Sequence, residues 1–98
     1  MYRTESFDKL LSGKLQNPEF GREFLLSSMH GEDGLDLIDA LKRVIACMGV
    51  KEYSAMSGIH RASVSRMLSS NETPRVATLN RYLLPFKLRV KIDVEDAA

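Results

Sequence analysis

Glycine and proline interrupt the hydrophobic pattern of this 98-residue chain at short intervals, at Pro18, Gly31, Gly49, Gly58 and Pro74. Between these breaks, apolar residues recur three and four positions apart, which is the spacing of one helix face. Helices this short are stable only when they pack on one another. The sequence therefore predicts an all-α fold, a bundle of short helices.

Several of the predicted helices begin at capping residues. Asn17 followed by Pro18 is typical of a helix start, and Asp33 is placed to cap the next helix. That helix has the widest apolar stripe, so we expect it to be the most deeply buried. Thr73 and Pro74 form another cap-plus-proline pair, which predicts the start of the last helix.

The hydrophobic period changes from about 3.6 to 2 after Phe86, which predicts one strand at the end of the chain. Four apolar residues alternate there with charged ones: Leu88, Val90, Ile92 and Val94. A single strand leaves its backbone donors and acceptors without partners in its own chain. We therefore expect these residues to pair with a second copy across a two-fold axis, which makes the protein a homodimer.

Charge is divided unevenly along the chain. Residues 1–40 contain eight Asp and Glu and four Lys and Arg, whereas residues 60–91 contain seven Lys and Arg and one acid, Glu72. We expect an acidic helical segment over residues 1–33 and a second unit over residues 34–98 that holds the basic surface. A basic stretch in a nearly neutral chain favours a polyanionic partner, although a solvated charged face is the alternative.

Residues 53–68 combine the features of a helix-turn-helix. Ser54 or Ala55 is the small residue that lets the second helix cross the first, and Gly58 forms the turn. Apolar residues are spaced to hold the second helix down: Ile59, Val64, Met67 and Leu68. The opposite face is small or basic and contains no carboxylate, which suits a helix that enters the major groove of DNA: Arg61, Ala62, Ser65, Arg66 and Ser69.

Residues 50–92 resemble the lambda-repressor-like (Xre-type) helix-turn-helix, and more specifically the addiction-module antidote proteins related to the HigA antitoxins. The segments that carry the resemblance are Gly58-Ile59-His60-Arg61-Ala62-Ser63-Val64, Arg66-Met67-Leu68-Ser69, Pro74, Thr78-Leu79 and Leu88-Arg89-Val90-Lys91-Ile92. The acidic part from Phe7 to Gly31 and the helix from Leu35 also resemble this family. The chain departs from the family pattern at Pro85-Phe86-Lys87, just before the strand, and at His60, which replaces the usual serine cap.

The resemblance implies that a homodimer binds a palindromic operator in double-stranded DNA, with two recognition helices in successive major grooves about 34 Å apart. It places four residues at the base edges: Arg61, Ala62, Ser65 and Arg66. It places seven more at phosphates: Lys51, Tyr53, Ser63, Ser69, Asn71, Thr73 and Arg75. It further implies an antitoxin that represses its own operon and neutralises a small basic ribonuclease-type toxin, of the RelE or HigB kind, for which the acidic segment is the docking surface.

Other classes of protein find little support in the sequence. Cys47 falls on the predicted buried helix, and His30 and His60 are isolated, so we expect no enzyme activity, no metal and no cofactor. The chain lacks a membrane-spanning run and a signal peptide, and its one cysteine cannot form an internal disulfide, which predicts a cytoplasmic protein. Two alternatives stay open: a stand-alone phage-type or metabolic repressor without a toxin, and a protein–protein interaction module whose helix-turn-helix no longer binds DNA.

Overall fold

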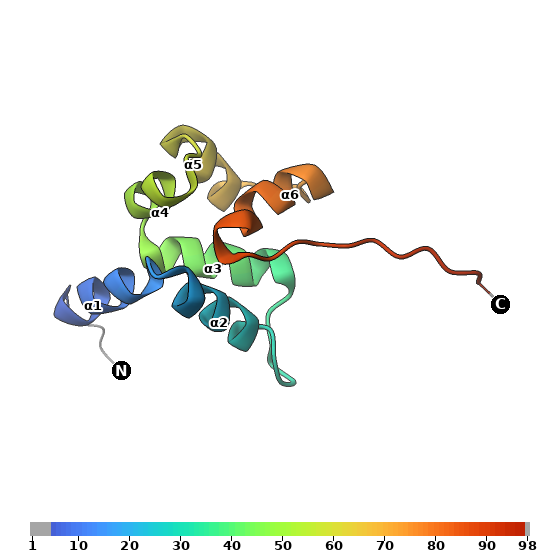
Figure 1. The fold of residues 1–98 in the computed structure, drawn as a ribbon, viewed down its shortest axis with the longest axis horizontal. Helices are drawn as coiled ribbons and strands as arrows, with labels where there is room; N and C mark the ends of the chain where they lie inside the picture. The colour runs from blue at the N-terminus through green and yellow to red at the C-terminus, as the bar shows by residue number, and fades with distance from the viewer. Residues whose placement is uncertain (1–4, 98) are drawn as a thin grey trace.

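The computed structural model describes residues 5–97, which fold as six α-helices and one 3₁₀ turn (Figure 1). In chain order these are α1 (Glu5–Leu15), α2 (Pro18–Ser28), α3 (Leu37–Met48), α4 (Val50–Ser57), α5 (Arg61–Ser69), α6 (Val76–Leu83) and η1 (Leu84–Phe86). The prediction of an all-α fold built from short helices is confirmed.

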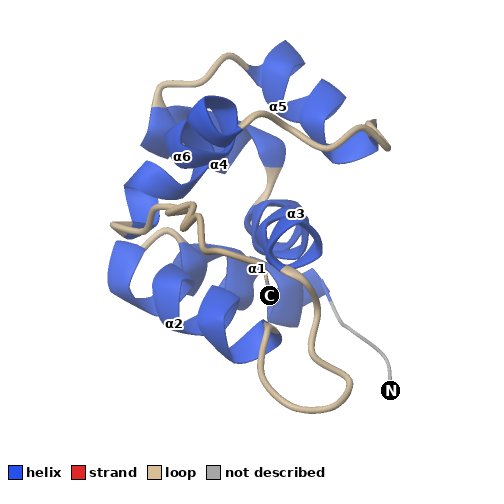
Figure 2. Cartoon of the chain, turned by 90° about the vertical axis from the view of Figure 1, so that its right-hand side faces the viewer, coloured by secondary structure: helices blue, strands red, loops and turns tan. Residues whose placement is uncertain are grey.

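Helix α3 lies in the middle of the structure. Helices α1 and α2 pack against it from one side, and α4 and α5 pack against it from the other (Figures 1 and 2). One hydrophobic cluster runs through all of these layers, with members that include Leu15, Leu25, Val44, Ile45, Val64, Leu83 and Phe86. The acidic segment predicted over residues 1–33 therefore has no separate core among the described residues, because Leu15 and Leu25 belong to the same cluster as α3 and α5.

The cap at the start of α2 is confirmed, whereas the cap predicted for α3 is wrong. The Asn17 side chain accepts hydrogen bonds from the backbone N–H groups of Glu19 and Phe20, at 2.9 and 3.3 Å. Helix α3 is capped by Asp36, which accepts from Asp39 N–H at 2.8 Å, and not by Asp33. The preceding residues close a turn instead, since Leu35 N–H donates to the carbonyl of Ser28 at 2.8 Å.

The start of α6 also differs from the prediction. The residue at the N-cap is Arg75, in an extended conformation and without a side-chain cap hydrogen bond, so Thr73 does not cap this helix. At its other end, α6 tightens into the 3₁₀ turn that contains Pro85, because proline lacks the N–H that another helical turn would need. The buried ring of Phe86 then anchors the end of the helical part of the chain in the core.

The predicted C-terminal strand is not present in the single chain. Residues 88–97 run away from the helices as an extended segment, and residues 5–97 contain no strand (Figure 1). Leu88 and Val90 are half-buried against the core, but Ile92 and Val94 are 67% and 95% exposed. A strand needs a second backbone for its ladder of hydrogen bonds, and the described part of the chain offers none here.

The described residues show no membrane span and no metal cluster. No helix within residues 5–97 combines the length and the apolar character that crossing a bilayer requires. The same residues hold no group of three or more His, Cys, Asp or Glu side chains that could bind a metal ion. The Cys47 side chain lies on α3 and packs, half-buried, against the core.

Candidate nucleic-acid interface

Helices α4 and α5 are joined by a tight turn of three residues that begins at Gly58. Gly58 has a φ of 76° and a ψ of 4°, a left-handed conformation that glycine adopts without steric cost. Its N–H donates to the carbonyl of Ser54 at 2.9 Å, and the Ser54 hydroxyl donates to the carbonyl of Ile59 at 2.5 Å. Of the two small residues predicted to permit the crossing, Ser54 is therefore the one that also closes the turn, while Ala55 is exposed.

The inner face of α5 packs as predicted. Val64 is fully buried and Ile59 nearly so, while Met67 and Leu68 are half-buried against the same cluster. A nine-residue helix is not stable alone in water, so these contacts hold it in place. The orientation of its outer face is therefore set by the core.

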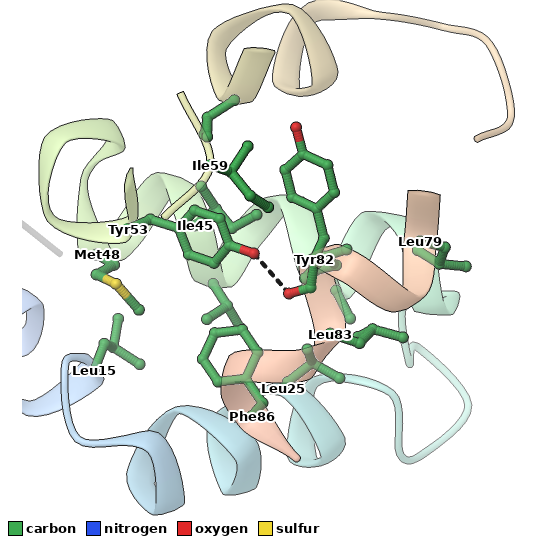
Figure 3. Packing of buried hydrophobic residues seen from close by; sticks show 14 residues of the cluster. Leu15, Leu25, Ile45, Met48, Tyr53, Ile59, Leu79, Tyr82, Leu83 and Phe86 are labelled. Carbon is green, nitrogen blue, oxygen red and sulfur yellow. Dashed lines mark hydrogen bonds between the residues drawn. The ribbon is translucent and has the colours of Figure 1, made fainter. Parts of the chain in front are cut away.

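Tyr53 is part of this core, so its predicted phosphate contact is wrong. The side chain has no exposed surface, and its hydroxyl donates to the carbonyl of Tyr82 at 2.6 Å (Figure 3). The ring stacks on that of Tyr82 with centroids 5.9 Å apart, and the centroid of Phe86 lies 6.2 Å away. Burial raises the pKa of Tyr53, which keeps the hydroxyl protonated as a donor. Apolar spacing with Val50 and Met56 was the sequence signal for this inward position.

The outer face of α5 presents the four residues predicted to reach base edges: Arg61, Ala62, Ser65 and Arg66. All four are exposed, and neither arginine forms an ion pair within residues 5–97. The Arg66 Nε donates to the carbonyl of Ala62 at 3.3 Å, so this side chain folds back along the helix. At the start of the helix, the Nδ1 atom of His60 accepts from Ala62 N–H at 3.2 Å, so the imidazole caps α5 in place of a serine hydroxyl.

A lysine that the sequence did not single out holds the other end of α5. The Lys42 ammonium on α3 donates to the carbonyl of Ser70, the C-cap residue, at 2.6 Å. A cation is favourable at this position because the carbonyls at a helix C-terminus carry partial negative charge. Nearby, the Ser69 hydroxyl donates to a carbonyl of its own helix, that of Ser65, at 3.1 Å. Its predicted phosphate contact would require it to give up this hydrogen bond.

A groove of about 430 Å³ lies beside α5, between its C-terminal half, the following loop and α6. Four predicted contact residues line it together: Ser63, Arg66, Thr73 and Arg75. The rest of its lining is Lys42, Met67, Ser70, Glu72, Pro74, Thr78 and Tyr82. Lys51 and Asn71 are exposed but do not line this α5–α6 groove. Three of its four charged lining residues are basic, and five others carry hydroxyl groups, which suits a phosphate group.

The positive charge of Arg66 affects the ionisation of Tyr82, which lines the same groove. Burial raises the pKa of the Tyr82 hydroxyl, while the positive charges of Arg81 and Arg66 act in the opposite direction and favour the ionised form. Arg66 and Tyr82 both line the groove. Arg66 therefore adds positive charge to the groove lining while its Nε atom is bonded to the Ala62 carbonyl.

A second hollow, of about 560 Å³, lies between α1 and α2 and was not predicted. Its lining is Lys9, Leu10, Gly13, Lys14, Asn17 and Phe20. Leu10 is 59% and Phe20 is 39% exposed, which is unusual for two large apolar residues side by side. The N-terminal helices thus carry an apolar groove with two lysines, in addition to their acidic side chains.

Comparison of the chain with protein-family models, with curated proteins and with solved structures finds no match. The Xre-type resemblance therefore stays a prediction. What the geometry establishes is an all-helical chain whose α4–turn–α5 unit presents a small and basic helix face next to a mainly basic groove.

Proposed function

We propose that the protein is a sequence-specific DNA-binding transcriptional regulator of the lambda-repressor-like helix-turn-helix type, with α5 as the recognition helix. The observation that carries this proposal is the outer face of α5. Its residues Arg61, Ala62, Ser65 and Arg66 are all exposed, small or basic, and free of carboxylates, on a helix whose inner face is held by the core. Such a face can approach base edges closely and offers two guanidinium groups to guanine.

The two arginines take different roles in this proposal. Arg61 is the first residue of α5, and the N-terminal residues of a recognition helix contact base edges. Arg66 lies at the rim of the α5–α6 groove with Ser63, Thr73 and Arg75, so we assign it to a phosphate as well as to the base edge that the sequence predicts. Phosphate contacts of this kind fix the register of the protein on the duplex.

The regulator acts as a homodimer in this proposal. Each C-terminal segment has no neighbouring strand within the described chain, and a second copy supplies one when the two segments form an antiparallel pair of strands. Two-fold symmetry then brings two α5 helices to the half-sites of a palindromic operator, about 34 Å apart.

The test begins with selection of bound sequences from a pool of randomised DNA duplexes, followed by affinity measurements over a range of salt concentrations. Arg61→Ala should weaken binding to the selected site by about 1–3 kcal/mol and relax the preference at one base pair. Arg66→Ala should weaken binding to all duplexes and lower the dependence of log K on log salt by about one unit. The matched control is Arg22→Ala, which removes an exposed arginine from α2, on the other side of the molecule from α5 (Figure 1).

Two results would contradict DNA binding by α5. The first is a wild-type protein that enriches no sequence and binds no duplex at low salt, which would favour the alternative of an interaction module. The second is an Arg61→Ala variant that keeps both the affinity and the sequence preference of the wild type while Arg22→Ala loses them.

A second function rests on the groove between α1 and α2. Exposed apolar side chains, Leu10 and Phe20 among them, support a protein-binding surface here. Acidic residues of the same helices, Asp8, Glu19 and Glu23, are exposed as well. We propose that these helices bind a small basic ribonuclease-type toxin, which makes the regulator an antitoxin that also represses its own operon.

Co-expression of the chain with the product of the neighbouring open reading frame tests this role. If that product is toxic, the wild-type chain should restore growth and co-purify with it, whereas a Leu10→Ser/Phe20→Ser double variant should lose both effects and keep its DNA affinity. A neighbouring gene whose product does not affect growth, together with intact operator binding, would favour the stand-alone repressor instead.

A further inference from the structure

The C-terminal segment is bound to the helical body along one edge only. Val90 N–H donates to the Oδ1 atom of Asn80 at 2.7 Å, and the Nδ2 group of Asn80 donates to the carbonyl of Val90 at 3.5 Å. Both backbone groups of Val90 are therefore turned toward α6. The side-chain amide of Asn80 takes the place that a neighbouring strand would occupy on this edge.

The opposite edge of the segment carries free backbone groups. In an extended chain, the N–H and C=O of one residue point to one edge and those of the next residue point to the other. Because Val90 faces α6, the backbone groups of Arg89, Lys91 and Asp93 face away from the body. Near Leu88 and Val90, whose own backbone groups are bonded to the helical body, a strand of a second copy can pair only with this outward edge.

This restriction leaves few registers for a symmetric antiparallel pair. The outward residues 89, 91 and 93 of one chain must lie opposite outward residues of the other. One residue of the segment therefore faces its own copy across the two-fold axis, and we name the axis position by that residue. The candidate positions for the axis are Val90, Lys91, Ile92 and Asp93, and side-chain chemistry distinguishes among them.

With the axis at Lys91, most of the side chains that face each other are complementary on both faces of the paired strands. The facing pairs are Arg89 with the partner's Asp93, Leu88 with the partner's Val94, and Val90 with the partner's Ile92. Opposite charges therefore meet on one face and apolar side chains meet on the other. The one like-charged pair is Lys91 with its own copy, and each Lys91 ammonium already lies 3.8 Å from the Asp93 carboxylate of the same chain.

The other axis positions place like charges opposite each other or set a carboxylate opposite an apolar side chain. With the axis at Val90, Arg89 lies opposite the partner's Lys91, which sets two positive charges against each other twice. With the axis at Ile92, the charged pairs are also complementary, because Arg89 lies opposite the partner's Glu95 and Lys91 lies opposite the partner's Asp93. The partner's Asp96, however, lies opposite Leu88 with that axis and opposite Val90 with the axis at Asp93, and these two residues pack against the core. Exposed charge pairs contribute little to stability, so the apolar face decides the comparison. Either arrangement is less favourable than the axis at Lys91.

We infer that a second copy of this chain pairs with the free edge of residues 88–94, antiparallel and with the two-fold axis at Lys91. The pairing rests on the proposed homodimer and adds its register and its specificity-determining pairs. Pairing also buries part of the Ile92 and Val94 side chains, whose exposure in the single chain is otherwise unexplained.

A charge exchange between Arg89 and Asp93 tests the register. Arg89→Asp and Asp93→Arg each place like charges opposite each other twice in the dimer, so each should raise the dimer dissociation constant by about tenfold at low salt. The double variant restores both pairs and should return to within about threefold of the wild type. With the axis at Ile92, by contrast, the double variant would be weaker than either single variant. These side chains are exposed, so circular dichroism should show that every variant keeps its fold.

Single cysteines in a Cys47→Ala background give an independent measurement. With the axis at Lys91, Lys91→Cys brings two sulfurs into facing positions, with Cα atoms about 5.5 Å apart, within the range for a disulfide. It should oxidise to a cross-linked dimer faster than Val90→Cys or Ile92→Cys. Fastest cross-linking at position 90 or 92 would overturn the register while leaving the homodimer and the DNA-binding proposal in place. A monomer at every concentration tested would overturn the pairing itself, and the operator affinity of that monomer, measured separately, then decides the DNA-binding proposal.

Discussion

Helix α5 and the C-terminal segment over residues 88–97 are the two regions assigned to partners, and the rest of the chain restrains them very differently. Helix α5 is capped by His60 at one end and held by Lys42 at the other, with Val64 fully buried between them. The C-terminal segment is tied to the body at Val90 and is exposed beyond that point.

The surface of α5 is already formed in the single chain, whereas the proposed surface of the C-terminal segment would be completed only by a second copy. All contacts that orient α5 lie within one chain, so its outer face is formed in the single chain, and little ordering free energy would oppose the proposed binding of DNA. Among the described residues, the C-terminal segment has protein partners only for the backbone groups of Val90 and the N–H of Leu88, so a second backbone could pair with many of the others. Stability of the first region should therefore depend on core residues, and that of the second on protein concentration.

Tyr53→Ala gives the largest expected effect. The variant removes a fully buried ring and its hydrogen bond to Tyr82, and should lower the free energy of unfolding by about 4 kcal/mol. Val94→Ala, in the exposed part of the C-terminal segment, should change it by less than about 0.5 kcal/mol. Urea unfolding at one fixed protein concentration measures both. A Tyr53→Ala protein that keeps wild-type stability but loses DNA affinity would instead support a phosphate contact for Tyr53.

Lys42→Met tests how α5 is held at its C-terminal end. Methionine keeps most of the apolar stem but cannot donate to the Ser70 carbonyl, so we expect a loss of about 1.5 kcal/mol in stability. Hydrogen exchange should accelerate at Ser70 N–H, which bonds to the carbonyl of Arg66, and remain slow at Tyr53. Lys51→Met, at an exposed lysine on α4, is the matched control. Equal exchange at Ser70 in both variants would show that Lys42 does not order this end of α5.

The same contrast explains how far the sequence could predict the structure. The α4–turn–α5 unit depends on local signals, namely Gly58 in the turn and the apolar spacing of Ile59 and Val64, and these predictions agree with the structure. Its one error, Tyr53, arose because an aromatic hydroxyl suits a phosphate contact as well as a buried hydrogen bond. Spacing alone did not show that the Tyr82 carbonyl lies 2.6 Å away.

Predictions that depended on contacts distant in sequence were less successful. Lys42 and Ser70 are 28 residues apart, and Asn80 and Val90 belong to different elements, so no local pattern pairs them. Asp33 has the chemistry of a cap, but Leu35 is drawn back to the end of α2 and moves the start of α3 to Leu37. The alternating pattern after Phe86 correctly describes a two-faced segment, but the described part of the chain holds no second strand to pair with it.

Asn80→Ala tests the tie between α6 and the C-terminal segment. Loss of the two hydrogen bonds to Val90 should lower stability by about 1 kcal/mol and accelerate hydrogen exchange at Val90 N–H. Asn80→Asp keeps the acceptor for that N–H and should retain most of the protection. Because the tie decides which edge is free, the alanine variant should also dimerise more weakly. Unchanged exchange at Val90 in Asn80→Ala would show that the segment is held by the packing of Leu88 and Val90 alone.

The smallest effect is expected at the start of α5, where His60→Asn should stabilise the protein by about 0.5 kcal/mol. The imidazole Nδ1 accepts from Ala62 N–H at 3.2 Å, whereas an asparagine side chain is among the best N-cap acceptors. Thermal unfolding of both proteins at one concentration measures the difference, and His60→Ala, which has no acceptor, should lose a similar amount. A less stable asparagine variant would mean that the imidazole ring contributes through its packing as well as through the cap. The orientation of α5 would then depend on the packing of the exposed His60 ring as well as on core contacts such as that of Val64.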